Sequence, residues 1–116
     1  MQVIFMYSLS NNIENTIEIK KSKFITKLYK VNNIEEVNQI LDKTNKEFSD
    51  ATHVCFAYIL PNTEKCSDNG EPSGTAGLPM LNVLKKKNLT NILAIVIRYF
   101  GGIKLGAGGL VRAYSN

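Results

Sequence analysis

The sequence predicts an α/β domain of the α+β kind, in which amphipathic helices cover one sheet. Two observations lead to this prediction. Strand-like segments dominate the first part of the chain, and helix-like and strand-like segments alternate after them. In addition, 116 residues with 44% apolar side chains are enough to bury one core, so we expect residues 1–116 to form a single domain.

The first elements expected are a loosely held N-terminal segment and a hairpin. Residues 1–15 have weak periodicity, so no firm element is predicted there. Ile17 and Ile19 alternate with charged residues, and apolar and β-branched residues resume over 24–31. This pattern predicts two short strands, whose lysines either protect an exposed edge or add to a basic stripe.

An amphipathic helix and a central strand follow. Asn33 and Glu36 form a capping-box-like start, and apolar residues then recur at helical spacing over 34–48. Residues 53–60 have mostly apolar side chains on both alternating faces, which predicts a strand with neighbours on both sides. A polar loop is predicted over 61–65.

The last elements expected are a helix, a buried strand and the start of another helix. Leucines at helical spacing predict a helix over 75–87, with Pro79 in its first turn. The continuous apolar run 92–97 is typical of a strand buried on both faces. A further helix begins near 106–109, and we expect the chain to end inside it.

Composition excludes several classes of protein. Two cysteines are too few for a disulfide framework, and the N-terminus lacks the basic region of a signal peptide. No apolar run approaches the roughly 20 residues of a membrane span. We therefore expect a cytoplasmic protein with no membrane partner, whose oligomeric state the sequence leaves open.

Charge and glycine are both unevenly distributed. Residues 1–71 carry eight lysines and ten acidic residues, whereas residues 72–116 carry six cationic side chains and no acidic one. All eight glycines lie between Ser67 and Arg112. A glycine-rich region of positive potential favours anionic partners, although the lysine run 85–87 also fits the solvated end of a helix.

The glycines fall into two blocks, residues 67–77 and 98–112. The second block leads from a buried strand into a helix, a geometry that binds phosphate because free N–H groups and the positive helix end converge there. Ala107 stands where a P-loop needs Lys, and Val111 stands where the dinucleotide fingerprint needs a third glycine. An ATPase or a nicotinamide enzyme is therefore not expected.

A looser anion-binding or nucleic-acid-binding site is predicted in the second block. Its N–H donors would come from Gly108 and Gly109. The candidate residues are cationic, aromatic or glycine: Arg98, Tyr99, Gly101, Gly102, Lys104, Gly106, Gly108, Gly109 and Arg112. In the alternative interpretation the glycines only form a tight corner, and Arg98 and Arg112 pair with acidic residues of the first block.

A hydrolase-like enzyme acting on a small anionic substrate is the second class of function. His53 is the only histidine, and therefore the only ready base at neutral pH. The candidate catalytic set is His53, Asp68, Glu71 and Ser73. Ser73 lacks the spacing of a nucleophile elbow, and Cys55 and Cys66 lack the close pairing of a zinc site. No catalytic residue, metal or cofactor is therefore assigned.

The two blocks resemble those of the IMPACT/YigZ family. The resemblance covers most of the chain from about residue 17 and runs through residues 21–24, 51–58, 67–77 and 98–114. Relatives commonly have Thr in place of Ile97 and a second Asp in place of Asn69. These are small departures from a long and specific pattern.

The resemblance implies a fold and a set of partners. The family domain is similar to a small-subunit ribosomal protein and to domain IV of elongation factor G, which implies two layers, a mixed sheet with helices on one face, and a left-handed crossover. Eukaryotic relatives control translation by competing for the activator of a starvation-sensing kinase, while bacterial members have no settled activity. These relatives carry further domains that we do not find in this sequence.

Together these points predict a non-enzymatic binding domain with a role in translation or its regulation. The partner is expected to be RNA, the ribosome or a protein, contacted through the basic glycine-rich face. Arg98, Lys104 and Arg112 would contact anionic groups. Tyr99 and Phe100 would stack or anchor, unless they are core residues, which we expect more of Phe100.

Overall fold

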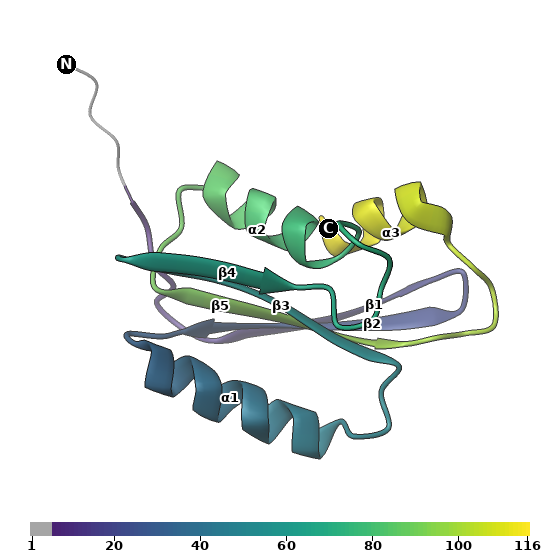
Figure 1. The fold of residues 1–116 in the computed structure, drawn as a ribbon, viewed down its shortest axis with the longest axis horizontal. Coiled ribbons are helices and arrows are strands. Elements are labelled where there is room, and N and C mark those ends of the chain that lie inside the picture. Colours follow the sequence, from purple (N-terminus) through teal and green to yellow (C-terminus); the bar gives the residue numbers. More distant parts are fainter. Residues whose placement is uncertain (1–5) are drawn as a thin grey trace.

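The structure is a computed structural model that describes residues 6–116 (Figure 1). Strands and helices follow the order β1 (Ile13–Ile19), β2 (Ser22–Lys30), α1 (Ile34–Glu47), β3 (His53–Leu60), β4 (Thr63–Ser67), α2 (Gly77–Lys86), β5 (Ile92–Tyr99) and α3 (Gly106–Tyr114). The α+β class predicted from the sequence is confirmed. None of the helices in the described part of the chain is long and apolar enough to span a membrane.

The sheet has the strand order β1-β2-β5-β3-β4, and every neighbouring pair is antiparallel. The mixed sheet implied by the resemblance is therefore wrong. The reason lies in the strand order. β2 and β3 run in the same direction, and so do β4 and β5. An antiparallel strand lies between the two members of each pair. No two parallel strands of the five are hydrogen-bonded neighbours.

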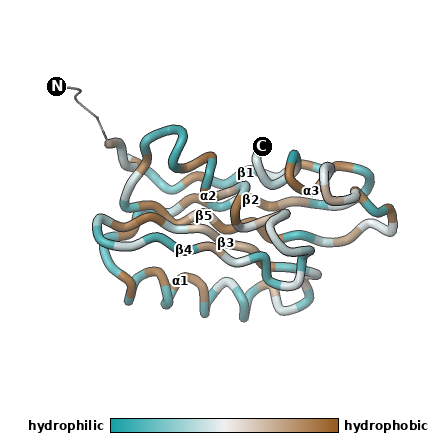
Figure 2. The backbone as a smooth tube through the Cα atoms, turned by 45° about the horizontal axis from the view of Figure 1, so that its top comes forward, coloured by the Kyte–Doolittle hydropathy of each residue, from teal (hydrophilic) through white to brown (hydrophobic). Residues whose placement is uncertain are grey.

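Helices cover both faces of the sheet, so the expectation of two layers with helices on one face is also wrong. α1 lies on one side, and α2 and α3 lie on the other (Figure 1). The central strand β5 requires this, because its buried apolar side chains divide between two core clusters, one on each face. Figure 2 colours this segment toward the hydrophobic end of the scale. Ile95 packs in one cluster with Val37 of α1. Val96 packs in another with Met80 of α2 and Leu110 of α3.

Two connections cross over an intervening strand, β2-α1-β3 and β4-α2-β5. We view the sheet from one face and turn it so that the first strand of a connection points up. In this orientation, both connections lead to a second strand on the same side. The two connecting helices lie on opposite faces (Figure 1). The crossovers must therefore have opposite hands, and one of them is left-handed, as the resemblance implied.

Local signals explain α1, whereas β4 was not predicted. Asn33 caps α1 by accepting from the Glu36 N–H at 2.9 Å, and the Glu36 side chain accepts from the Asn32 N–H at 2.9 Å. The polar loop expected over 61–65 is wrong, because Thr63–Ser67 pairs with β3 as an edge strand. Its exposed polar side chains give no apolar alternation to recognise.

The N-terminal segment is partly anchored. Residues 1–5 of the segment expected to be loose lie outside the described residues. Tyr7 donates its N–H to the Asn88 carbonyl and accepts from the Thr90 N–H, both at 2.8 Å. The first strand then begins at Ile13, before the predicted alternation at Ile17.

Candidate functional site

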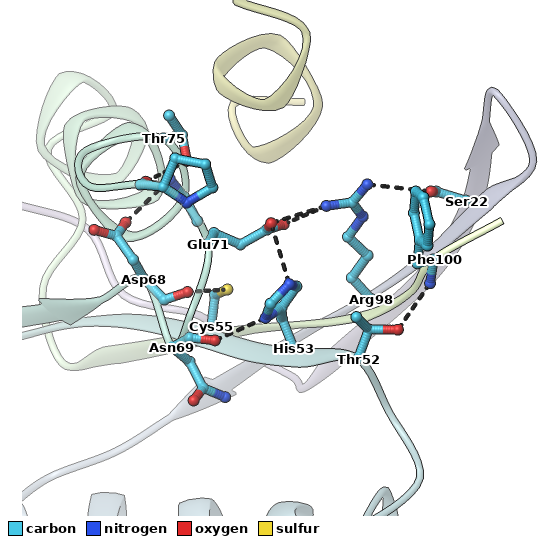
Figure 3. Close-up of polar contacts among 12 residues, drawn as sticks. Ser22, Thr52, His53, Cys55, Asp68, Asn69, Glu71, Thr75, Arg98 and Phe100 are labelled. Carbon is cyan, nitrogen blue, oxygen red and sulfur yellow. Dashed lines mark hydrogen bonds and ion pairs between the residues drawn. The ribbon is translucent and has the colours of Figure 1, made fainter. Parts of the chain in front are cut away.

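A buried ion pair joins the two glycine blocks. Arg98, the last buried residue of β5, points Nη1 at both carboxylate oxygens of Glu71, at 2.9 and 2.7 Å (Figure 3). The two side chains are only 6% and 3% exposed. A buried pair of opposite charges with two close contacts is strongly coupled, so this contact fixes the first block against the central strand.

Two more side chains surround the Glu71 carboxylate. Tyr114 of α3 donates its hydroxyl to Oε2 at 2.6 Å, and His53 Nε2 lies 3.3 Å from Oε1. The other ring nitrogen of His53, Nδ1, lies 2.8 Å from the Asn69 carbonyl oxygen. Because a carbonyl only accepts, Nδ1 carries a proton, and Nε2 hydrogen-bonds to the carboxylate only when it is protonated as well. Glu71 therefore connects β3, β5 and α3.

The same cluster reaches the β1–β2 hairpin through Ser22. Its Oγ accepts from Arg98 Nη2 and from the Gly101 N–H, both at 3.3 Å. A Cβ at position 101 would overlap the Lys21 carbonyl, so only glycine permits this approach. Sequence reasoning named neither Ser22 nor Tyr114 as a site residue, although both lie within the segments that resemble the family.

Asp68 caps the N-terminus of α2, although it lies nine residues before the first residue of that helix. Its carboxylate accepts from the N–H groups of Gly74, Ala76 and Gly77 at 2.9, 3.1 and 2.9 Å. Burial alone would raise the pKa of Asp68, but these three donors outweigh it and leave the pKa below its ordinary value. The anion site at the start of α2 is therefore already filled by a side chain of the protein.

Cys55 lies beneath the cluster as a neutral thiol. Its Sγ is 3.1 Å from the Asp68 carbonyl oxygen and 3.5 Å from Tyr114 Oη. Burial raises the pKa of Cys55 to about 12, and that of Tyr114 is also raised, again mainly by burial. A thiol with this pKa is not a nucleophile at neutral pH.

Of the four candidate catalytic residues, His53 and Glu71 contact each other, whereas the carboxylate of a third, Asp68, faces the start of α2. Each of the three is hydrogen-bonded within the protein, as described above. Ser73 is exposed, and the polar contacts found for His53 are with Asn69 and Glu71 instead. Within residues 6–116 no group of three or more His, Cys, Asp or Glu side chains is arranged to hold a metal ion. The arrangement stabilises the fold, and donors of the protein itself engage the carboxylates of Asp68 and Glu71.

The second block separates into buried and exposed members. Arg98 is 5% exposed and pairs with Glu71, so the expectation that it contacts a surface anion does not fit its position. Tyr99 is half-buried and donates its hydroxyl to Asp50 at 2.8 Å. Phe100 is 46% exposed, so the core expectation was wrong: it follows the end of β5 and lies beside the Arg98 guanidinium.

The remaining candidate residues lie in the loop before α3 and along α3 itself, with Arg112 in its last turn. Gly101 and Gly109 are half-buried, and the others are exposed: Gly102, Lys104, Gly106, Gly108 and Arg112. At Gly102 and Gly106 the φ angles are 91° and 76°, in the left-handed region that favours glycine. In contrast to α2, α3 has no side chain that caps its N-terminus among the described residues.

Further cations come from the β1–β2 turn. Lys20 and Lys21 are exposed and have φ angles of 48° and 66°. Lys20 and Arg112 line one groove of about 290 Å³ together with Leu105, which directly follows Lys104. We call four exposed cations, Lys20, Lys21, Lys104 and Arg112, the basic face.

Comparison with known proteins identifies the family. Residues 20–116 match the Impact N-terminal domain family. The chain is 52% identical over 104 residues to IMPACT family member YvyE of Bacillus subtilis (strain 168), covering 87% of this chain and 48% of that protein. The chain thus spans about half the length of this relative.

Solved structures agree with the fold. A crystal structure of a hypothetical protein matches with a TM-score of 0.87 and 40% identity, covering 91% of this chain and 54% of that one. The two-domain translational regulator Yih1 matches with a TM-score of 0.55 and 24% identity, covering 92% and 47%, which shows likeness of fold alone. Because residues 20–116 match the family domain and YvyE is 52% identical over most of the chain, this chain belongs to the IMPACT family.

Proposed function

We propose that this domain binds RNA, free or within the ribosome, through the basic face and takes part in translation or its regulation. The observation that carries the proposal is the separation of charges. The carboxylates of Asp68 and Glu71 are engaged inside the protein, whereas the four cations of the basic face are exposed. The description of Yih1 as a translational regulator adds support.

The parts of such a site have distinct roles. Lys20, Lys104 and Arg112 would contact phosphates, and the uncapped N–H groups at the start of α3 would add donors. The exposed ring of Phe100 offers a face on which an unpaired base can stack. Glycine at 102 leaves open space where a side chain would otherwise stand, so the RNA backbone can approach closely.

The engagement of the candidate acid–base residues argues against the enzymatic alternative. His53 contacts the Glu71 carboxylate, and that carboxylate is nearly inaccessible. An anionic substrate would have to displace Arg98 or Tyr114 from Glu71 before it met a basic group there. Binding at the exposed face requires no such rearrangement.

The test compares two charge-matched double variants in fluorescence anisotropy with labelled oligouridylate at low and high salt. Lys104→Ala/Arg112→Ala removes two cations of the basic face, and Lys43→Ala/Lys46→Ala removes two from α1 on the opposite side of the sheet. The first variant should bind weakly, with a salt slope reduced by about 1.4 if two phosphate contacts are lost. The second should bind like the parent protein.

Two results would contradict the proposal. Equal loss in both variants would mean that net charge alone attracts RNA. No binding by the parent protein to oligouridylate or to purified ribosomal subunits would exclude RNA for this domain and favour a protein partner for the basic face.

A further inference from the structure

α2 and α3 lie on the same face of the sheet (Figure 1), and side chains of both line a groove. It has a volume of about 440 Å³. Leu78 of α2 and Val111 of α3 are 47% and 38% exposed in it, and Pro79 is buried beside them. Two large apolar side chains exposed on facing helices make a candidate contact surface for a partner.

The walls of the groove follow helical rows. Leu78, Asn82 and Lys86 recur every four residues on α2, and Val111 of α3 is followed four residues later by Ser115, the C-cap of that helix. α2 has 10 residues and is therefore about 15 Å long. A short helix with apolar side chains on one face matches a groove of this form, because its side chains recur at the same interval.

The charge around the groove indicates which kind of helix would bind there. Residues 72–116 contain no acidic side chain, and Lys86 lines the groove. The three acidic residues that precede this stretch are each paired within the protein, and these are Glu64, Asp68 and Glu71. A basic segment would be repelled by such walls, and an acidic segment would be attracted.

The lining also distinguishes protein from RNA. The residues that line this groove are apolar, small or amide side chains with one lysine, and no aromatic ring is among them. Single-stranded nucleic acid gains much of its binding energy by stacking bases on aromatic rings. The groove therefore suits apolar side chains of a protein better than it suits bases.

We propose that the groove between α2 and α3 binds an acidic amphipathic helix of a partner protein. Apolar side chains of that helix contact Leu78 and Val111, and its carboxylates pair with Lys86. The residues of this surface differ from those of the basic face, so the inference is independent of the RNA-binding proposal.

The test uses a synthetic helical peptide with leucines on one face and glutamates on the other. Amide chemical shifts of the ¹⁵N-labelled domain should change at Leu78, Lys86 and Val111 when this peptide is added. The double variant Leu78→Ser/Val111→Ser should lose at least about tenfold in affinity. Ile34→Ser, which removes an apolar side chain that is 37% exposed on α1, should bind like the parent protein.

Control peptides and RNA decide what the groove recognises. A peptide with the glutamates replaced by lysines and a scrambled glutamate peptide should both bind more weakly than the amphipathic acidic one. Because both substituted side chains are exposed, the double variant should keep the parent amide spectrum and its oligouridylate affinity. Equal binding of the scrambled peptide, an unaffected double variant, no peptide binding, or loss of RNA binding in that variant would each overturn the proposal.

Discussion

Arg98 and Glu71, 27 residues apart in the sequence, form a buried ion pair in which one guanidinium nitrogen contacts both carboxylate oxygens. The pair joins the end of the central strand to the turn before α2. Tyr114 and His53 contact the same carboxylate from α3 and β3. One acidic side chain thus holds together three elements, β3, β5 and α3.

Removing Glu71 should therefore destabilise the whole domain. Glu71→Ala leaves the Arg98 charge buried without its partner, and breaking such a pair costs about 3–5 kcal/mol. Urea denaturation followed by circular dichroism measures this loss. Asp42→Ala is the control, because it removes the partner of Lys46 in a pair whose side chains are 69% and 78% exposed, and it should have little effect.

A double variant separates the ion pair from the other contacts of its members. Because Arg98 and Glu71 act together, the loss in Glu71→Ala/Arg98→Ala should be smaller than the sum of the two single losses. Strict additivity would show that the two side chains stabilise the domain independently, against the geometry of the pair.

Asp68→Asn should destabilise α2 at neutral pH by about 0.5–2 kcal/mol, the usual loss for a helix cap. The pKa of Asp68 is lowered in the folded protein, so its contribution is fully present above the unfolded pKa near 3.9 and is lost as pH falls through the folded value. Urea denaturation of the parent protein and of Asp68→Asn measures their free energies of unfolding. The difference between the two should be constant near neutral pH and should shrink in acid. A difference that grows in acid would contradict the capping role.

The two cysteines should differ in reactivity. Burial raises the pKa of Cys55 to about 12, and Cys66 is only half-buried on the edge strand, although its pKa is also raised by burial. Iodoacetamide should therefore alkylate Cys66 first in the native protein and Cys55 only in denaturant. Mass spectrometry of tryptic peptides locates the label, and equal native labelling of both thiols would contradict the buried position of Cys55.

Local patterns were enough to predict several elements. The Asn33 cap with helical periodicity predicted α1, and the continuous apolar run predicted β5 as a strand buried on both faces. These signals come from residues that are close together in the sequence, so they can be recognised without knowledge of the fold. The edge strand β4 has no such signal, since it is held by pairing with β3.

The candidate site depended on contacts that are distant in the sequence. Arg98 was expected at the surface because its block is glycine-rich and basic, but its partner Glu71 belongs to another block and buries it. The Ser22 hydroxyl reaches Arg98 across 76 residues, and periodicity gives no indication of such a contact. The tight-corner alternative thus applies to Arg98 and Glu71, whereas Arg112 is exposed.

The β1–β2 turn should show a trade between stability and binding. Lys20 and Lys21 occupy a two-residue hairpin loop between Ile19 and Ser22, and both have positive φ. Such loops favour Asn-Gly, and a left-handed conformation costs other residues roughly 1–2 kcal/mol each. The strained lysines place their charges at the basic face. A binding role would explain why lysine occupies two positions with an unfavourable backbone conformation.

Lys20→Asn/Lys21→Gly should therefore raise the free energy of unfolding by about 1–2 kcal/mol while weakening binding to oligouridylate. Urea denaturation and fluorescence anisotropy measure the two effects on the same preparations. Lys21→Gly alone is the matched control: it relieves part of the strain, keeps the Lys20 charge in its groove, and should lose less affinity than the double variant. A double variant that is more stable and binds RNA as tightly as the parent would show that the turn lysines do not belong to the RNA site, and that the basic face is limited to Lys104 and Arg112.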